Sequence, residues 1–137
     1  MEAQAFLKPG FRYAVVGATT NEQKYGYRVL QDLHGAGFSV VGVNPKYKDI
    51  TGIPCYPGLG ELPWKPDVVV VVVPPGVGIL ILEEAKRIGL QKLWFQPGAE
   101  SAEIFARAAA LGIVINEPGT CIMVARRLLQ ESKGKNL

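Results

Sequence analysis

The most regular feature of the chain is an apolar run at residues 67–73, in which one aspartate precedes six consecutive valines. A strand with one face in water would alternate apolar and polar residues, and this run does not alternate. Continuous β-branched residues are typical of a strand buried on both faces, in the middle of a parallel sheet. The run is far too short to span a bilayer. We therefore expect residues 67–73 to form a central strand of a soluble protein.

Shorter apolar runs alternate with helical periodicities along the rest of the chain. In the first helical segment Tyr25, Val29, Leu30 and Leu33 share one apolar face. Ser101 is placed to cap a later helix, and Gly112 to end it. The expected strands lie at residues 13–16, 39–43, 53–56, 92–95 and 113–115, and the expected helices at 22–36, 79–88, 102–111 and 122–130, with a single helical turn near 59–62.

This alternation predicts the fold class. Strands that are separated by helices and buried on both faces specify an α/β protein, a single-domain Rossmann-like open parallel β-sheet with helices on both faces. Four prolines between residues 44 and 65 exclude a long regular element there. The 137 residues contain no internal repeat or linker, so we expect one domain over residues 1–137, with 131–137 as a flexible tail.

Composition and charge narrow the class of protein. Hydrophobic residues make up 48% of the chain, enough for a sizeable core, and the net charge of +3 suits a small anionic ligand but is too weak for nucleic acid. The first eight residues do not predict a signal peptide. The two cysteines form neither a disulfide framework nor a zinc motif. We expect a cytoplasmic protein without membrane or nucleic-acid partners, while oligomeric state and protein partners stay open.

Ligands of such sheets bind at the carboxyl ends of the strands, so the residues that follow each strand are the candidates for a site. The first strand is followed by Gly17, Ala18, Thr19, Thr20 and Asn21, directly before a helix. Small residues let the backbone approach a phosphate, and free amides at a helix N-terminus favour anions. A tight strand-to-helix turn is the ordinary alternative. The segment favours phosphate binding without requiring it.

The residues after the second strand further narrow the class of ligand. A dinucleotide fingerprint would place glycines at positions 17, 19 and 22, and only Gly17 fits. NAD-binding folds usually carry a carboxylate after the second strand, where this chain has Asn44, Pro45 and Lys46. A lysine there suits a phosphate on the ribose, as in NADP or coenzyme A (CoA). The alternative is an ordinary solvated lysine beside a turn.

Three further loops complete the same edge. The valine strand is followed by Pro74, Pro75 and Gly76, which predict an extended exit where a flat ring such as adenine can stack. A rigid loop that starts the next helix is the alternative. The last two strands are followed by short polar segments with glycine, at residues 96–100 and 116–120. The aromatic residues Tyr47, Tyr56, Trp64 and Trp94 fit a pocket, the core or an interface equally well.

The order and spacing of several segments resemble a known family. These are Val-Val-Gly-Ala-Thr at 15–19, Val-Asn-Pro-Lys at 43–46, Gly-Ile-Pro-Cys-Tyr at 52–56, the valine run into Pro-Pro at 67–75, Glu-Ala at 84–85 and Leu-Trp-Phe-Gln-Pro-Gly at 93–98. Together they resemble the stand-alone CoA-binding proteins, which are similar to the nucleotide-binding domain of the succinyl-CoA synthetase alpha subunit and related acyl-CoA synthetases. The resemblance covers residues 10–130.

The resemblance implies a role for each candidate residue. The pyrophosphate would lie on Gly17, Ala18, Thr19 and Thr20, with Lys24 as a charge partner. The ribose 3′-phosphate would meet Lys46, with Asn44 and Pro45 shaping its approach. The adenine site would be lined by Val73, Pro74, Pro75 and Val77, and the pantetheine arm would be faced by Gln96, Pro97, Gly98 and Asn116. The sequence departs from the synthetases at residues 116–121, Asn-Glu-Pro-Gly-Thr-Cys, where they have an Asn-Cys-Pro-Gly type segment.

Catalytic machinery is not evident in the sequence. The phosphohistidine of succinyl-CoA synthetase has no counterpart, because the only histidine, His34, falls in the first helix, away from the strand ends. Glu83 and Glu84 have the character of ordinary helix residues. We therefore expect a protein that is not an enzyme, and that binds CoA or an acyl-CoA as a carrier, a sensor or a detached synthetase module.

Three other hypotheses remain. One is an NADP-binding oxidoreductase or redox sensor, which Lys46 permits but the missing glycine pattern disfavours. Another is a regulatory partner protein whose nucleotide site is vestigial. The third concerns Cys121, which opens the last helix, where the helix N-terminus favours a thiolate. It would form a mixed disulfide with the CoA thiol, and a buried structural cysteine is the alternative.

Overall fold

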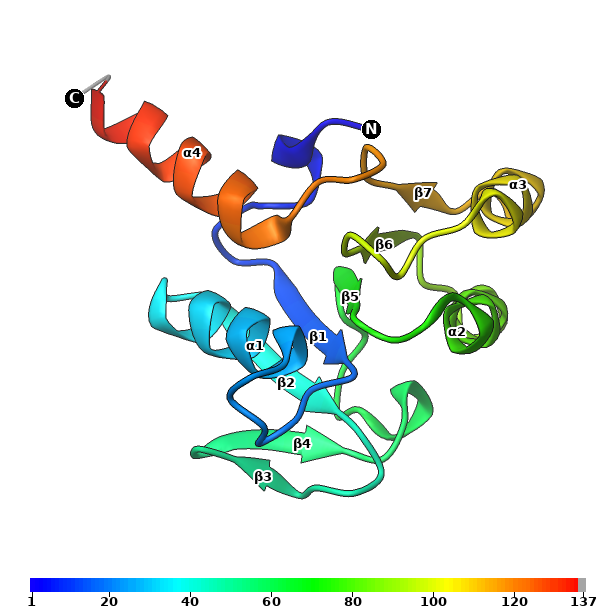
Figure 1. Cartoon of the computed structure of the whole chain (residues 1–137), viewed down its shortest axis with the longest axis horizontal. Helices are drawn as coiled ribbons and strands as arrows, with labels where there is room; N and C mark the ends of the chain where they lie inside the picture. Colours follow the sequence, from blue (N-terminus) through cyan, green and yellow to red (C-terminus); the bar gives the residue numbers. More distant parts are fainter. Residues whose placement is uncertain (136–137) are drawn as a thin grey trace.

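Seven strands form one sheet in the computed structural model, which describes residues 1–135 and the side chains through residue 132 (Figure 1). The spatial order is β3-β4-β2-β1-β5-β6-β7, and every neighbouring pair is parallel except β3 and β4. The strands are β1 (Arg12–Val16), β2 (Ser39–Val43), β3 (Asp49–Ile50), β4 (Ile53–Tyr56), β5 (Val68–Val71), β6 (Lys92–Phe95) and β7 (Val114–Ile115).

Helices cover both faces of this sheet. The helix α1 (Tyr25–Gly35) and the helix α4 (Ile122–Lys135) lie on one face, and α2 (Pro75–Arg87) and α3 (Ala102–Leu111) lie on the other (Figure 1). Two short 3₁₀ turns, η1 (Ala3–Ala5) and η2 (Leu59–Glu61), complete the elements. The predicted α/β, Rossmann-like fold with a mostly parallel sheet and helices on both faces is confirmed. Within residues 1–135, no helix has the length and apolarity needed to cross a membrane.

The strand order reverses between β1 and β5. From β1 the chain builds outward through β2 to β4, and it then returns to the other side of β1 to build β5, β6 and β7. Apart from the small strand β3, this is the doubly wound order in which ligands bind at the reversal point. The connections leaving β1 and β5 diverge to opposite faces, so the carboxyl ends of these two strands border an open crevice.

The valine strand β5 occupies the centre that its composition predicts. Val68 and Val70 pack with α1 and α4, whereas Val69 and Val71 pack with α2 and α3. All four are fully buried, because parallel neighbours flank the strand on both sides and helices cover both faces. This arrangement explains why the run shows no polar alternation.

The N-terminal segment is anchored to the core by contacts that the pattern of hydrophobic residues in the sequence did not predict. Phe6 is fully buried, with its ring edge-on to Trp94 at 5.3 Å between centroids. The buried hydroxyl of Tyr13 donates to the carbonyl of Phe6 at 2.7 Å and accepts from the amide of Lys8 at 3.2 Å. Burial raises the pKa of Tyr13 to about 12. The segment therefore closes the end of the core beside α4.

The sheet ends in very short strands on both edges. At one edge β3 and β4 form a hairpin joined by Thr51 and Gly52, with φ angles of 52° and 88°. Positive φ at both central residues is typical of the tight turns that suit the twist of a hairpin. The carboxylate of Asp49 accepts from the Gly52 amide at 3.0 Å. At the other edge β7 has only two residues. The sequence predicted β4 and β7 but not β3.

Several element boundaries differ from those the sequence predicted. The helix α1 begins at Tyr25 rather than near 22, because the Asn21 side chain accepts from the Gln23 amide and holds a turn there. Tyr25 is 56% exposed, so it does not join the buried face formed by Val29, Leu30 and Leu33. The first helical residue of α2 is Pro75, a position that suits proline, so the β5 strand is shorter and the helix longer than expected.

The C-terminal prediction also needs correction. The helix α4 continues to Lys135, five residues beyond its expected end at residue 130. Residues 136–137 of the expected tail lie outside the described residues.

A close contact between two glycines fixes how α1 sits on β1. A methyl group on Gly26 would lie 2.0 Å from the carbonyl oxygen of Gly17. No side chain fits in that space, so Gly26 lets the first turn of α1 lie directly on the loop that follows β1. This glycine serves the close helix–strand packing that the dinucleotide fingerprint assigns to its last glycine. It stands four residues after position 22, where the fingerprint would place it.

We predict that Gly26→Ala lowers the free energy of unfolding by about 1–3 kcal/mol, because the added methyl forces backbone apart. Urea unfolding followed by circular dichroism measures the change. Gly35→Ala is the matched control in the same helix, since nothing lies within 4 Å of its added methyl. We expect the control to stay within about 1 kcal/mol of the wild type or to exceed it. Equal losses in both variants would contradict the packing role of Gly26.

Candidate functional site

Two adjoining cavities lie along the carboxyl ends of the central strands. The larger has a volume of about 630 Å³ and the smaller about 300 Å³. They share Tyr25, Val72 and Val73, so we treat them as one cleft. The larger is also lined by Gly17, Thr19, Asn21, Gln23, Lys24, Gly26, Asn44, Lys46 and Tyr47, and the smaller by Pro74, Pro75, Gln96, Pro97, Gly98 and Ala99. The cleft therefore lies at the point where the strand order reverses.

The loop after β1 forms the floor of the larger cavity. Gly17 has a φ of 97°, and a methyl group there would lie 2.3 Å from the carbonyl oxygen of Val72. Glycine is thus required where the β1 and β5 exits meet. Ala18 is fully buried, whereas Thr19 is half-buried and Thr20 exposed. Of the four predicted pyrophosphate residues, Gly17 and Thr19 line the cavity, and Ala18 and Thr20 do not.

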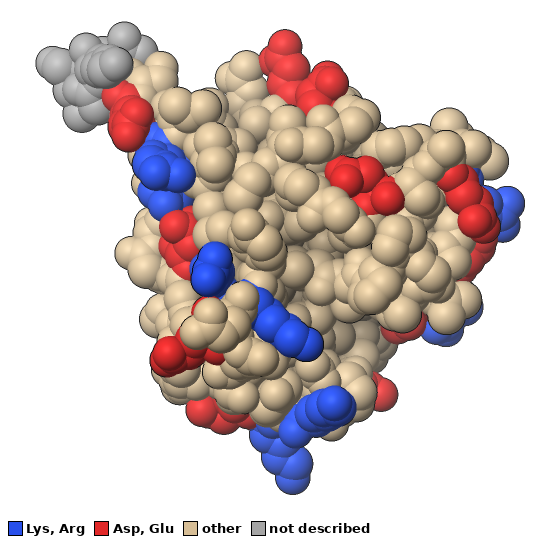
Figure 2. Space-filling view, viewed as in Figure 1, with Lys and Arg blue, Asp and Glu red and all other residues tan. Residues whose placement is uncertain are grey.

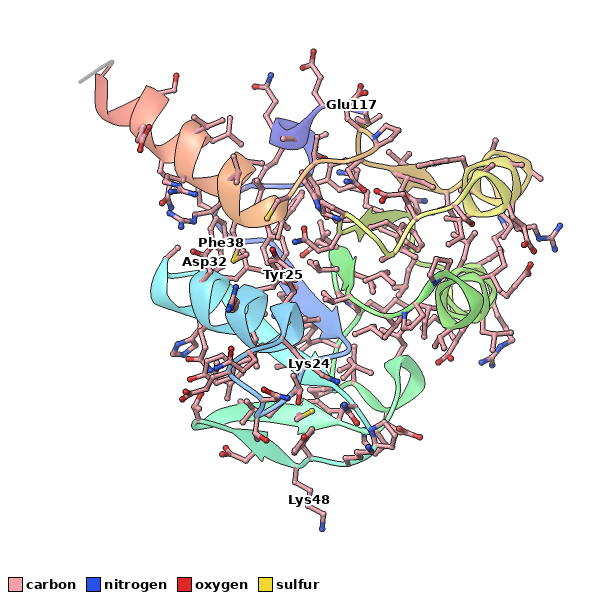
Figure 3. All side chains as sticks on the ribbon, in the orientation of Figure 1. Lys24, Tyr25, Asp32, Phe38, Lys48 and Glu117 are labelled. Atoms are coloured by element: carbon pink, nitrogen blue, oxygen red, sulfur yellow. The ribbon has the colours of Figure 1, made fainter. Side chains whose placement is uncertain are left out.

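The N-terminus of α1 opens onto the same cavity. Lys24 is its N-cap residue, and no side chain accepts a hydrogen bond from the first amides of the helix. Uncapped amides and the helix dipole together favour a negative group at this end. Figure 3 labels Lys24 and Tyr25 at the start of α1, and both line the cavity. Lys24 therefore lines the same cavity as Gly17 and Thr19, and its role as a charge partner of a pyrophosphate stays a prediction.

Asn44 ties the loop after β2 to the loop after β1. Its amide nitrogen donates to the carbonyl of Ala18 at 2.9 Å, and its oxygen accepts from the backbone amide of Lys46, also at 2.9 Å. These bonds fix the backbone of Lys46 at the wall of the larger cavity, with the side chain exposed. Pro45, between them, is exposed and lines neither cavity.

Tyr47 is a cavity residue whose role the sequence left open. Its hydroxyl lies 3.2 Å from Oγ1 of Thr19 and accepts from Oγ1 of Thr20 at 3.4 Å. Chiefly through the hydrogen bond with Thr19, the pKa of Tyr47 is lowered from its ordinary value. The ring thus joins the loops after β1 and β2 from the solvent side. Its position directly after Lys46 was the one available signal.

The smaller cavity has a different character. Val73, Pro74 and Pro75 form one wall, and Pro97 and Gly98 form the other. Val77, assigned with them, is exposed on α2 and lines neither cavity. In Figure 2 Lys and Arg side chains, with Asp and Glu between them, lie over α1 and beside β3 and β4, while the surface between α1 and α2 is uncharged. Because Lys24 and Lys46 line the larger cavity and no charged residue lines the smaller one, the cleft has a basic end and an apolar end.

Gln96 lines the smaller cavity, but its side chain forms hydrogen bonds within the protein. It is only 3% exposed. Its oxygen accepts from Nε1 of Trp94 at 3.0 Å and from the backbone amide of Ile122 at 2.7 Å, and its nitrogen donates to Sγ of Cys121 at 3.3 Å. The Ile122 amide is the first of α4, so Gln96 joins the end of β6 to the start of that helix. The polar groups of its side chain are engaged within the protein.

The side chain of Asn116 is buried inside the protein and does not line the cleft. It is 4% exposed and lines neither cavity. Its oxygen accepts from the Phe95 amide at 2.7 Å, and its nitrogen donates to the Phe95 carbonyl at 3.1 Å. The side chain thus makes the two hydrogen bonds to Phe95 that the backbone of a neighbouring strand would make, just after β7 has ended. The predicted contact of Asn116 with a pantetheine arm has no support in this arrangement.

The groups needed for catalysis are scarce around the cleft. Lys24, Lys46, Tyr25 and Tyr47 are its ionisable lining residues, and within residues 1–135 no carboxylate, histidine or cysteine lines it. His34 is exposed in the last turn of α1. Glu83 forms an ion pair with Arg107. No cluster of His, Cys, Asp or Glu suited to a metal ion occurs among the described residues.

Comparison with known families decides the relationship. A family model described as the CoA binding domain matches residues 12–127, from the first residue of β1 into α4. This chain belongs to the CoA-binding domain family. The resemblance drawn from the sequence motifs is therefore confirmed. The matched range contains every residue that lines the cleft.

Individual relatives of this CoA-binding domain agree with that assignment. An ADP-forming acetate–CoA ligase from Archaeoglobus fulgidus is 38% identical over 74 residues, which cover 54% of this chain and 11% of the ligase. A solved conserved hypothetical protein from Pyrococcus furiosus is 48% identical, with a TM-score of 0.79 over 83% of this chain and 97% of that one. A hypothetical protein from Pyrococcus horikoshii OT3 is 29% identical, with a TM-score of 0.85 over 93% and 89% of the two chains.

We predict that Asn116→Ala in this CoA-binding domain lowers the free energy of unfolding by about 1–3 kcal/mol, because it leaves two buried backbone groups of Phe95 without partners. Thermal and urea unfolding measure the loss. Thr19→Ala is a suitable comparison, since Thr19 is half-buried and its hydrogen bonds lie at the solvent side of the cleft. A stability of Asn116→Ala equal to that of the wild type would contradict the structural role.

Proposed function

We propose that the protein binds CoA, or an acyl-CoA, in the cleft at the carboxyl edge of the sheet. The observation that carries this proposal is the combination of an uncapped helix N-terminus with two lysines at one end of a cleft and an uncharged, proline-lined wall at the other. CoA has the same polarity, because its phosphates are highly charged and its pantetheine arm is not. Membership of the CoA-binding domain family supports the same ligand.

The pyrophosphate fits the loop after β1. Gly17 brings the backbone close to the cavity, Thr19 lines it with a hydroxyl-bearing side chain, and the uncapped start of α1 lines the same space. Lys24 adds a positive charge at the rim. Ala18 and Thr20 serve this site by shaping the loop, since the Ala18 carbonyl holds Asn44 and the Thr20 hydroxyl holds Tyr47.

The ribose 3′-phosphate fits Lys46. The Lys46 side chain is exposed at the wall of the same cavity, and its backbone is fixed by Asn44. Within residues 1–135 no carboxylate lies within ion-pair distance of Lys46, so its charge is free to meet an anion. The adjoining Pro45 limits the backbone of this turn.

The remaining parts of CoA fit the uncharged end. Val73, Pro74 and Pro75 offer a flat apolar wall for the adenine ring, and Val77 follows Pro75 by two residues in α2. Pro97 and Gly98 form the facing wall along which the pantetheine arm would run. In this proposal Gln96 and Asn116 support that wall from behind, through their bonds to Trp94 and Phe95.

We further propose that the chain acts as one domain, as a carrier, a sensor or a detached module of a CoA ligase, rather than as an enzyme. Among the described residues that line the cleft there is no carboxylate, histidine or cysteine, and its ionisable groups are two lysines and two tyrosines. The segment matched by the acetate–CoA ligase is 11% of that protein. The ligase activity is therefore a property of a much longer chain.

We predict that Lys46→Ala weakens CoA binding by about 1–3 kcal/mol, roughly 5- to 150-fold, while dephospho-CoA binding stays unchanged, because only CoA carries the 3′-phosphate. Isothermal titration at one fixed salt concentration measures both ligands. Lys48→Ala is the matched control, because Lys48 is exposed nearby and points away from the molecule in Figure 3. Equal losses for both ligands would remove Lys46 from the 3′-phosphate.

The same titration separates the competing functions. Saturable binding of CoA that depends on the 3′-phosphate supports the proposal. Binding of NADPH without CoA would indicate an oxidoreductase instead. Silence with CoA, dephospho-CoA, NADPH and ATP would overturn nucleotide binding altogether and favour a vestigial site.

We predict that, as the pH rises from about 7 to 10, CoA affinity falls more steeply in the wild type than in Tyr47→Phe. The pKa of Tyr47 is lowered from its ordinary value of 10.0, chiefly by the hydrogen bond with Thr19, so its phenolate forms at lower pH than that of an ordinary tyrosine and adds a negative charge beside the bound diphosphate. Phenylalanine keeps the ring but cannot ionise. Titrations of both proteins across the range measure the difference, and parallel pH profiles would contradict it.

A further inference from the structure

A second groove lies at the edge of the sheet opposite the cleft. It consists of two adjoining cavities of about 220 and 270 Å³, which share Lys65, Pro66 and Leu90. The first lies beside the amino ends of β1, β5 and β6, where Phe11, Asp67 and Lys92 line it. Because the strands are parallel, this groove and the cleft are separated by the full length of the strands. Both can be occupied at the same time.

One end of the groove is basic. Lys65 and Lys92 line it, and Nζ of Lys92 lies 5.0 Å from the centre of the Phe11 ring. Lys8 lies over the same ring at 5.9 Å. The ion pairs of the described residues join Glu83 to Arg107 and Asp32 to Arg126, so none neutralises these lysines. Asp67 lines the same end and accepts a hydrogen bond from the Arg12 backbone amide at 2.8 Å, so two lysines there face one carboxylate.

The other end of the groove is apolar and contains an aromatic ring. Leu62, Trp64 and Ile88 line it, and all three are half-buried. The guanidinium of Arg12 lies 5.3 Å from the centre of the Trp64 ring. Tryptophan and arginine are the residues most enriched among those that dominate binding at protein interfaces. Apolar and basic surface are thus continuous along one groove.

From this juxtaposition we propose that the groove docks an acidic segment of a partner polypeptide that carries an apolar anchor side chain. The anchor occupies the space between Trp64 and Ile88, and neighbouring carboxylates meet Lys65 and Lys92. Charge complementarity supplies both orientation and rate of association. A nucleic acid has the negative charge but no aliphatic anchor, and a small free anion leaves the apolar end empty. The proposal is independent of the CoA site.

A fluorescein-labelled peptide of sequence DELFED tests this proposal by fluorescence anisotropy at low salt. We expect saturable binding with a dissociation constant below about 1 mM, and none by DESSED, which keeps the charges but lacks the anchor. Lys65→Glu should weaken binding at least about tenfold. Lys48→Glu, an equal change of charge on an exposed lysine outside the groove, should change it less than about twofold.

Three results would overturn the proposal. The first is absence of saturable binding by DELFED to a wild-type protein whose circular dichroism spectrum shows that it is folded. The second is an equal loss with Lys65→Glu and Lys48→Glu, which would show attraction to net charge alone. The third is DESSED or a single-stranded oligonucleotide binding as well as DELFED with the same dependence on Lys65. If Lys65→Glu unfolds, Lys65→Gln is compared with a Lys48→Gln control. Circular dichroism and thermal unfolding report the folded state of each variant.

Discussion

Where β1 ends, the backbone of three elements meets without side chains between them. Gly17 touches the exit of β5 at Val72, and Gly26 lies directly on the Gly17 carbonyl, so α1 starts against the loop that it covers. This contact sets the distance between the first turn of α1 and the edge of the sheet. Because of it, Thr19, Val72 and the first residues of α1 all line one cavity. A larger residue at either glycine would push α1 away from the loop after β1 and widen the basic end of the cleft.

Much of the fold was predictable because its strands are marked by local composition. The bounds of β2, β4 and β6 match those expected from the sequence. The misses arise where contacts distant in sequence decide the outcome. Phe6 is buried only because Trp94 and Tyr13 receive the N-terminal segment, and no periodicity announces this. The small strand β3 depends on a two-residue turn at Thr51, a residue that rarely adopts positive φ.

In the candidate site too, the position of the cleft was predictable from the sequence, whereas the directions of individual side chains were not. Strand ends locate the cleft, because parallel strands bring their carboxyl ends to one edge, and the loops after β1, β2, β5 and β6 do meet there. Side-chain direction was not predictable. Asn116 follows a strand as a ligand residue would, yet it bonds to Phe95 inside the protein. Tyr25 reads as a core residue by spacing, yet its place in the first turn of α1 turns it toward the cleft.

The two-residue strands at the ends of the sheet have a consequence for behaviour at high concentration. An exposed long strand presents a row of free amides and carbonyls on which another chain can add, and this is a common route to aggregation. Here β3 and β7 leave only a brief ladder at each margin, and Asp49 and Lys48 place charges beside one of them. Growth of the sheet from molecule to molecule is thereby blocked at both margins. The short edge strands therefore leave little backbone on which a second copy of the sheet could add.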